Sequence, residues 1–314
     1  ISERGYDLIY DLIIIGAGPA GMTAGIYANR AMLNSVIIEN DGFCGGQILT
    51  TSDIQNYPGF YLIDGFELAE RIKEHGKKLG CKFTAGNVRR IEKQDKTFRL
   101  ILEDGGYMES KAVIIATGAR HRKLGVKGEE ELAGKGVSYC AVCDGAFFRN
   151  KTVAVIGGGD TSLKDAIYLA RVCAKVYIII RRDVFRASKS LIYSVEHTDN
   201  IEIIQNTVVE SINGADKVEN LSLRNKIADG TSVLAVDGVF VAIGAEPVTE
   251  FVKGLIEINE KGYIVADETG VTSMDGIFAA GDIRTKSLRQ IITAAADGAN
   301  CANSAERYLE KLKG

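Results

Sequence analysis

The most constraining feature of the sequence is a glycine-rich turn between an apolar strand and a helix near its start. In YDLIIIGAGPAGMTAGIYANRAMLNSVIIEN, an apolar run is followed by Gly16, Gly18 and Gly21 in the spacing G-x-G-x-x-G. A second apolar run ends on Glu39. The glycines let the backbone approach a pyrophosphate at the helix N-terminus, and an acid in this position binds a ribose. This context predicts a binding site for a dinucleotide, FAD or NAD.

The same arrangement recurs in the middle of the chain, in KTVAVIGGGDTSLKDAIYLARVCAKVYIIIRRDVFRASKS. Gly157 and Gly159 match the first two glycines, and Ser162 takes the third position, where a small residue still allows close helix packing. The second strand runs into three arginines instead of an acid: Arg181, Arg182 and Arg186. Guanidinium groups there suit a 2′-phosphate, so this half is predicted to prefer NADPH to NADH. The alternative is a solvated basic turn.

Two similar segments bracket the second nucleotide-binding half. AVIIATGA at 112–119 and VFVAIGAE at 239–246 each read as an apolar strand that ends in a glycine turn. We therefore expect an α/β protein with two Rossmann-like, three-layer domains, one of them inserted into the other. The predicted boundaries are 1–120 and 246–314 for the first domain and 121–245 for the inserted domain.

The C-terminal part contains a further apolar strand, in GIFAAGDIRTKSLRQIITAAADGAN, which ends on Gly281 and Asp282. An acid at such a strand end can hydrogen-bond a ribityl hydroxyl or orient a phosphate. It can equally serve as the N-cap of the helix that follows, and the two roles are compatible.

Length and charge limit the classes of partner. The chain has 314 residues and a formal net charge of −3 at pH 7, and this length favours two domains over one. The small negative charge gives no general reason to expect nucleic acid or an anionic membrane as a partner. No apolar run approaches the length that spans a bilayer. We expect a cytoplasmic protein that binds neither.

Of the six cysteines, only Cys140 and Cys143 are close in sequence, in SYCAVCDGAFF. The pair could be a redox centre, half of a zinc site or a structural bridge. Zinc needs four ligands, yet there is no second close pair and the three histidines stand alone, so we expect no metal. A permanent bridge is not expected in a reducing cytosol, which favours a redox pair. Asp144 could move the proton of a departing thiolate, or simply form an Asp-Gly turn.

Taken together, these motifs resemble the low-molecular-weight thioredoxin reductases over essentially the whole chain. The resemblance is carried by GAGPAG, CGGQILTT, NYPGF, CAVCDG, GGGDTS, RRDVFR and the GD and RQ pairs near the C-terminus. It implies a thioredoxin-disulfide reductase with FAD and NADPH as cofactors, a homodimer, and thioredoxin as the protein substrate.

The resemblance also implies roles for individual residues. Cys140 and Cys143 would form the redox disulfide, with Cys143 nearer the flavin and Asp144 as proton donor and acceptor. The residues implied for FAD are Gly16, Gly18, Pro19, Ala20, Gly21, Glu39, Gly46, Gln47, Asn56, Thr117, Gly281, Asp282, Arg289, Gln290 and Ile291. Those implied for NADPH are Gly158, Gly159, Asp160, Thr161, Ser162, Arg181, Arg182, Arg186, Ile243 and Gly244.

Two positions depart from the family pattern. Ile180 stands where the family usually has His before the arginine pair, and Lys164 stands where it usually has Glu, with Asp165 next. The Glu position lies toward the nicotinamide in related flavoproteins, so another electron donor or another disulfide partner is an alternative. A non-catalytic nucleotide-binding redox sensor is a further one.

The order of the motifs raises a geometric problem. The cysteine pair and the NADPH motifs share the inserted domain, yet both must reach one flavin held by the other domain. We therefore expect the inserted domain to rotate about its two connections, near 118–121 and 244–247.

Overall fold

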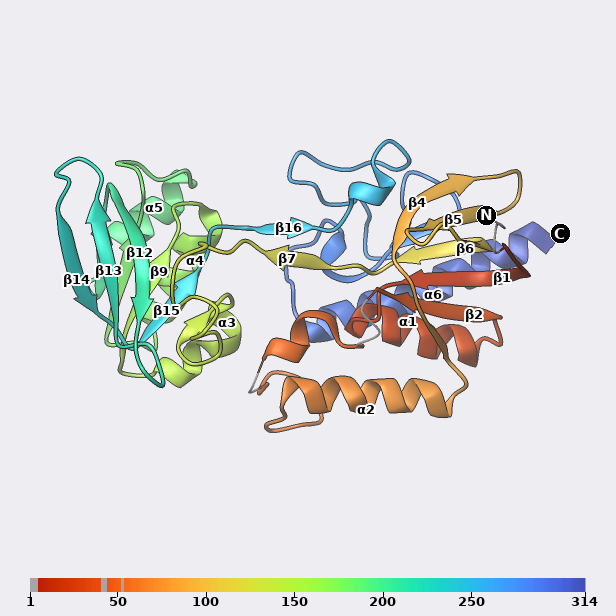
Figure 1. The fold of residues 1–314 in the computed structure, drawn as a ribbon, viewed down its shortest axis with the longest axis horizontal. Helices are drawn as coiled ribbons and strands as arrows, with labels where there is room; N and C mark the ends of the chain where they lie inside the picture. The colour runs from red at the N-terminus through yellow and green to blue at the C-terminus, as the bar shows by residue number, and fades with distance from the viewer. Residues whose placement is uncertain (1–4, 41–43, 52–53, 314) are drawn as a thin grey trace. The chain divides into compact units, whose positions relative to one another are not determined.

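The computed structural model describes residues 5–40, 44–51 and 54–313. They form two compact units (Figure 1). The first comprises Ile1–Arg120 and Glu246–Gly314, and the second is the continuous segment His121–Ala245. Where the chain passes between the units, β7 (Ala119–His121) and β16 (Ala245–Pro247) pair in a two-stranded sheet.

The first unit is built on a sheet in the order β3-β2-β1-β6-β5-β4, with β17 also paired to β6. The parallel strands are β1 (Gly5–Ile15), β2 (Ser35–Glu39), β3 (Lys82–Ala85), β6 (Tyr107–Ile115) and β17 (Ile277–Ala279). The antiparallel strands are β4 (Val88–Lys93) and β5 (Phe98–Leu102). Its helices are α1 (Pro19–Arg30), α2 (Gly65–Lys78) and α6 (Ile291–Lys313), with short 3₁₀ turns η1 (Gly46–Thr50), η3 (Glu250–Val252) and η4 (Gly281–Ile283).

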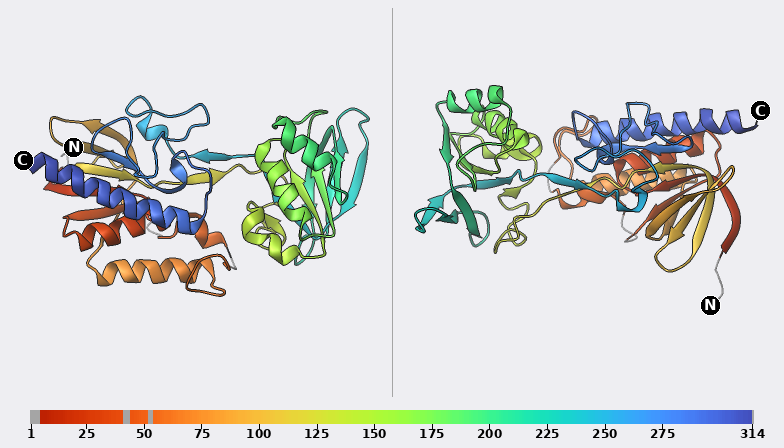
Figure 2. Two further views of the ribbon diagram at one scale, coloured as in Figure 1. Left: turned by 180° about the vertical axis from the view of Figure 1, so that it is seen from behind. Right: turned by 90° about the horizontal axis from the view of Figure 1, so that it is seen from above.

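Strand β1 is apolar on both sides because both faces of the sheet are covered. Leu12 and Ile14 belong to a core with residues of α1 and α6, whereas Ile13 and Ile15 belong to a second core with β5. Successive side chains of a strand point to opposite faces, so a continuous apolar run is what a strand between two layers requires. Figure 2 shows α6 lying along one face of this unit.

The second unit repeats the design around a parallel sheet in the order β11-β10-β9-β15-β8. These strands are β8 (Val137–Ser138), β9 (Thr152–Ile156), β10 (Lys175–Ile179), β11 (Ile201–Ile204) and β15 (Gly238–Val241). The helical segments are α3 (Ala141–Asp144), α4 (Asp160–Ala170), α5 (Lys189–Glu196) and the 3₁₀ turn η2 (Gly145–Phe148). An antiparallel sheet contains β12 (Thr207–Asn213), β13 (Asn220–Asn225) and β14 (Thr231–Ala235).

Strand β9 sits between the two outer layers of this unit. Val153 and Val155 pack with Leu163 of α4, while Ala154 and Ile156 share a core with Leu221 of the antiparallel sheet. Helices therefore cover one face and the small sheet covers the other (Figures 1 and 2). The predicted α/β class, with parallel sheets and three layers, is confirmed. Within the described ranges, no helix is both long enough and apolar enough to cross a membrane.

Candidate functional site

The first glycine turn is shaped by close backbone contacts. Gly16 has φ +103°, and a Cβ on it would lie 2.5 Å from the carbonyl oxygen of Ala116. A Cβ at Gly21 would lie 1.8 Å from the carbonyl oxygen of Gly16, so the first turn of α1 can pack on the strand only without a side chain. Gly18 is the N-cap of α1 and has open space at its Cβ position, with Pro19 following as the first helical residue. The turn therefore presents an open helix N-terminus to a phosphate.

Two further segments meet this turn. Glu39 accepts a hydrogen bond from the Ala17 N–H at 2.7 Å, which places its carboxylate beside the glycines. The Gly45 N–H donates to the carbonyl of Ala17 at 2.8 Å, and a Cβ at Gly46 would lie 3.5 Å from the Cα of Gly18. The acid at the end of β2 and the Gly45–Gly46 pair thus border the same dinucleotide-binding turn.

Residues expected at the flavin end make hydrogen bonds to distant parts of the sequence, and two of them contact each other. Asn56 Nδ2 donates to Gln290 Oε1 at 2.9 Å, across 234 positions of sequence. Gln47 donates to the carbonyl of Ala119. The Thr117 hydroxyl donates to the carbonyl of Val248 at 3.0 Å.

Two buried polar atoms near the start of α6 lack hydrogen-bond partners among the described residues: Asp282 Oδ1 and Arg289 Nε. Burial raises the pKa of Asp282, and the Lys286 and Arg289 cations partly oppose that rise. The Arg289 guanidinium lies 4.1 Å from the ring centre of Tyr263. Unpaired buried polar atoms are uncommon, and a ligand with hydroxyl and phosphate groups would satisfy them. These residues therefore fit the hydroxyl-bearing chain of FAD.

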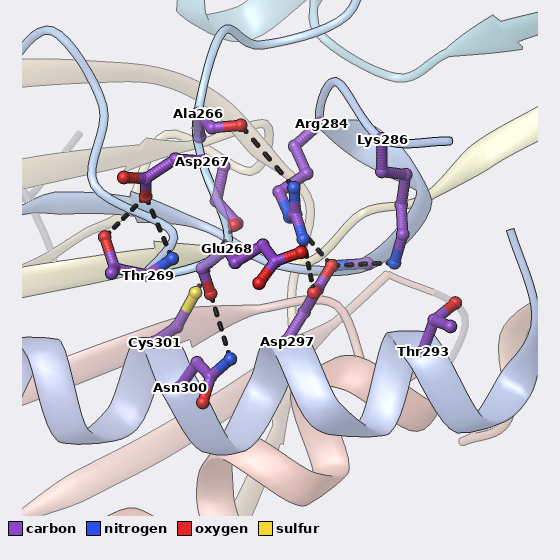
Figure 3. Close-up of polar contacts among 12 residues, drawn as sticks. Ala266, Asp267, Glu268, Thr269, Arg284, Lys286, Thr293, Asp297, Asn300 and Cys301 are labelled. Carbon is purple, nitrogen blue, oxygen red and sulfur yellow. Dashed lines mark hydrogen bonds and ion pairs between the residues drawn. The ribbon is translucent and has the colours of Figure 1, made fainter. Parts of the chain in front are cut away.

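A charged cluster near the start of α6 was not predicted from the sequence. Asp297 of α6 pairs with Arg284 at 2.6 Å and with Lys286 at 2.9 Å, and all three side chains are 6% exposed (Figure 3). One signal was available: Asp297 lies in the alanine-rich stretch 294–299, and an acid there requires a partner when the helix is buried.

Cys140 and Cys143 form a disulfide at the start of α3, with Cα atoms 5.3 Å apart. The Asp144 carboxylate accepts a hydrogen bond from the Ser138 hydroxyl at 2.6 Å, and the same hydroxyl oxygen accepts the Cys140 N–H at 3.1 Å. Ser138 is buried at the end of β8. It connects the Asp144 carboxylate to the backbone of Cys140, and no sequence motif pointed to it.

The segment that leads to the disulfide is held by a buried carboxylate. Glu129, which is 1% exposed, accepts hydrogen bonds from the N–H groups of Leu124 and Gly125. It also accepts the hydroxyl of Tyr139, the residue before Cys140, at 2.9 Å. Glu129 therefore holds Tyr139, the residue before the redox pair, against the backbone of Leu124 and Gly125.

The second glycine turn repeats the first with one change. A Cβ on Gly157 would lie 2.3 Å from the carbonyl oxygen of Ala242, and Gly159 is the open N-cap of α4. Ser162 is fully buried, and its hydroxyl donates to the carbonyl of Gly159 at 2.8 Å. The serine thus fits where the first unit needs glycine, and its hydroxyl stabilises the turn.

The basic segment after β10 folds back on this turn. The Arg186 N–H donates to the carbonyl of Gly158 at 2.7 Å, and Asp160 accepts the Ser188 N–H at 2.7 Å. Arg181, Arg182 and Arg186 are all exposed, and none forms an ion pair with a described carboxylate. Three unpaired guanidinium groups around an open helix N-terminus are suited to a phosphate.

The remaining residues predicted for NADPH are placed as follows. Thr161 is exposed in the first turn of α4, Ile243 packs against the core, and Gly244 has φ +106° and accepts the Arg122 N–H at 3.0 Å.

The two positions that depart from the family pattern differ in burial. Ile180 is 3% exposed, and a Cβ on Gly158 would lie 3.3 Å from it, so it packs beneath the glycine turn. Lys164 is exposed on α4. Asp165, which follows it, is partly buried with no hydrogen-bond partner among the described residues, and desolvation raises its pKa to about 7.

The chain matches the family described as pyridine nucleotide-disulphide oxidoreductase over residues 10–298. It is 45% identical to a thioredoxin reductase from Listeria innocua over 97% of this chain and 95% of that protein. It is 44% identical to one from Bacillus subtilis over 97% of this chain and 96% of that protein. The chain belongs to the thioredoxin reductases. The crystal structure of the Streptococcus pyogenes thioredoxin reductase, 45% identical, covers 98% of this chain and 100% of its own, with a TM-score of 0.93. No group of three or more metal-ligating side chains occurs among the described residues of this thioredoxin reductase.

Proposed function

We propose that the chain is an NADPH-dependent thioredoxin-disulfide reductase, which passes electrons from NADPH through FAD to the Cys140–Cys143 disulfide and then to thioredoxin. The observation that carries the proposal is this disulfide, with the Asp144 carboxylate held beside it through Ser138. It occurs in a chain with two glycine turns, each suited to a dinucleotide. Thioredoxin reductases of this family use FAD and NADPH.

When bound, FAD would accept a hydride from NADPH and deliver two electrons to a disulfide. The chain's own residues handle the protons. Reducing the Cys140–Cys143 bond consumes two electrons and two protons and yields two thiols. Asp144, which Ser138 links to the Cys140 backbone, would give a proton to one departing thiolate, and the reverse transfer would restore the thiolate that attacks the disulfide of thioredoxin. Ser138 holds the carboxylate for that transfer.

The two nucleotide sites are assigned to the two units. The first glycine turn, Glu39, Gly46 and the Asp282–Arg289 region would hold FAD, with Asn56 and Gln290 at its flavin end. The second turn would hold NADPH, with the 2′-phosphate bound by the exposed arginines. The redox disulfide and the NADPH turn belong to one unit, His121–Ala245. We therefore propose that this unit rotates about the connections near 118–121 and 244–247 between half-reactions, in a cytoplasmic homodimer.

An anaerobic titration of the flavin absorbance tests the electron path. The wild type should be bleached by NADPH and not by NADH, and should take up one more electron pair than Cys143→Ser. If NADPH leaves the flavin oxidised while dithionite reduces it, the donor site around Lys164 and Ile180 accepts another donor. No turnover of thioredoxin with a normally reduced flavin would favour a different disulfide partner or a redox sensor. A cross-link between the units should abolish turnover, and full activity of the linked protein would refute rotation.

A further inference from the structure

Asp297 lies where α6 packs closely on α1. At the next residue, Gly298, a Cβ would lie 2.1 Å from the carbonyl oxygen of Ala20 and 2.9 Å from the backbone nitrogen of Ala24. This contact requires glycine, so it fixes the rotation of α6 at this turn. The direction of the Asp297 side chain is therefore set by the packing of two helices.

The Asp297 carboxylate binds one short segment, residues 281–286, at several points (Figure 3). It accepts the Gly281 N–H at 2.9 Å and the Lys286 ammonium at 2.9 Å. It also accepts two hydrogen bonds from Arg284, from Nε at 2.8 Å and from Nη2 at 2.6 Å. Burial alone would raise the pKa of Asp297, but the hydrogen bonds from Arg284 and Lys286 outweigh it, and the pKa is lowered. One ionised carboxylate thus holds both ends of the segment that carries Asp282.

Lys286 places a buried positive charge close to Asp282, on whose carboxyl it acts together with Arg289. The Lys286 ammonium and the Arg284 guanidinium both pair with Asp297, and all three side chains are almost fully buried. Buried ion pairs of this kind add little to stability after desolvation, so a role in positioning explains the cluster better than a role in stability. The neighbouring Asp282 has an unpaired Oδ1, which a bound ligand would satisfy.

We propose that Asp297 is a positioning residue for the flavin end of FAD, through the Gly281–Asp282 turn and through the buried cation of Lys286. The inference rests on the proposed function, because it assumes that Asp282 and Arg289 contact FAD. Asp297 fixes where the Asp282 carboxylate meets the ligand. Lys286 adds a positive charge that favours the reduced flavin, because reduction adds negative charge to it.

The first test is the dissociation constant of FAD for the apoprotein of Asp297→Asn, measured by flavin fluorescence. We expect FAD to bind about 10- to 100-fold more weakly, the range for a lost charged hydrogen bond. Asn300→Ala is the matched control, because Asn300 lies on the same helix and donates to the carbonyl of Glu268 at 2.9 Å instead of to the turn. An unchanged dissociation constant in a folded Asp297→Asn protein would overturn the proposal.

Lys286→Met supplies a second, independent readout, since it leaves the Arg284–Asp297 pair in place. We expect a more negative flavin midpoint potential than in the wild type, with a similar melting temperature of the apoprotein. A purely structural role would lower that melting temperature and leave the potential unchanged, which would contradict the proposal even if Asp297→Asn failed to fold. Asp282→Asn distinguishes a wrong FAD site from a wrong role for Asp297. If Asp282→Asn binds FAD normally, the proposed FAD site is wrong. If Asp282→Asn weakens FAD binding and Asp297→Asn does not, only the role of Asp297 is wrong.

Discussion

Replacing Asp165 by asparagine should stabilise the protein at alkaline pH much more than at acidic pH. Burial raises the pKa of this carboxyl from 3.8 to about 7 in the folded protein. Because the pKa is higher in the folded protein, Asp165 loses its proton at a lower pH in the unfolded chain than in the folded one. The contribution of the protonated group to stability is complete below pH 3.8 and is lost as the pH rises through about 7. Asparagine resembles the protonated acid in shape and cannot ionise, so it avoids this loss.

The magnitude follows from the two pKa values. Relative to low pH, linkage predicts that ionisation of Asp165 lowers the unfolding free energy by about 1.7 kcal/mol at pH 5 and by about 4 kcal/mol at pH 8.5. The gain in unfolding free energy from Asp165→Asn should therefore be about 3 kcal/mol larger at pH 8.5 than at pH 5. By its helical spacing, Asp165 shares the face of α4 on which Tyr168 and Leu169 meet Gly145, just after the redox pair. The substitution therefore also probes the surroundings of the disulfide.

The assay is urea unfolding of the two proteins at both pH values, followed by far-UV circular dichroism. Flavin fluorescence recorded in parallel reports unfolding of the other unit. Asp199→Asn, an exposed aspartate of the same unit, controls for the loss of one negative charge. If Asp165→Asn raised the unfolding free energy equally at both pH values, the Asp165 carboxylate would not be desolvated and the prediction would be wrong.

Other predictions address the nucleotide turns and the approach to the disulfide. Gly18→Ala should leave the melting temperature of the apoprotein unchanged but weaken FAD binding, because its Cβ meets only open space; a large loss of stability would contradict this. Gly21→Ala should lower that melting temperature, because its Cβ would collide with a carbonyl oxygen. Arg181→Ala should raise the KM for NADPH roughly 10- to 100-fold and leave that for NADH nearly unchanged in steady-state assays; equal effects would refute a phosphate contact. Glu129→Gln should lower the unfolding free energy by about 1–3 kcal/mol in urea titrations, and an unaltered midpoint would count against its bridging role.

The sequence was sufficient for features that depend on local spacing. Gly16 and Gly21 were predicted from one short motif, and the structure shows the backbone contacts that exclude a side chain at both. The pairing of Cys140 with Cys143 also followed from their spacing and the lack of other close ligands, and the structure shows the disulfide between them. The roles of the individual residues toward FAD and NADPH remain predictions.

Features that depend on tertiary contacts could not be predicted in this way. Glu129 binds the loop before the disulfide, and Ser138 bridges to Asp144, but neither lies in a motif that specifies its partner. Asp297 meets Arg284 only because α6 packs back along the end of β17. Buried polar groups of this kind need partners, but the sequence does not say which ones.

The burial of the other cysteines has a consequence for chemical selectivity. Cys44, Cys81, Cys173 and Cys301 are free and buried, and burial raises the pKa of each thiol, to about 11 for Cys173 and about 12 for Cys301. Only a thiolate attacks a disulfide, so these four are poor competitors in exchange. A protein that handles mixed disulfides at every turnover is thereby protected from scrambling its own cysteines.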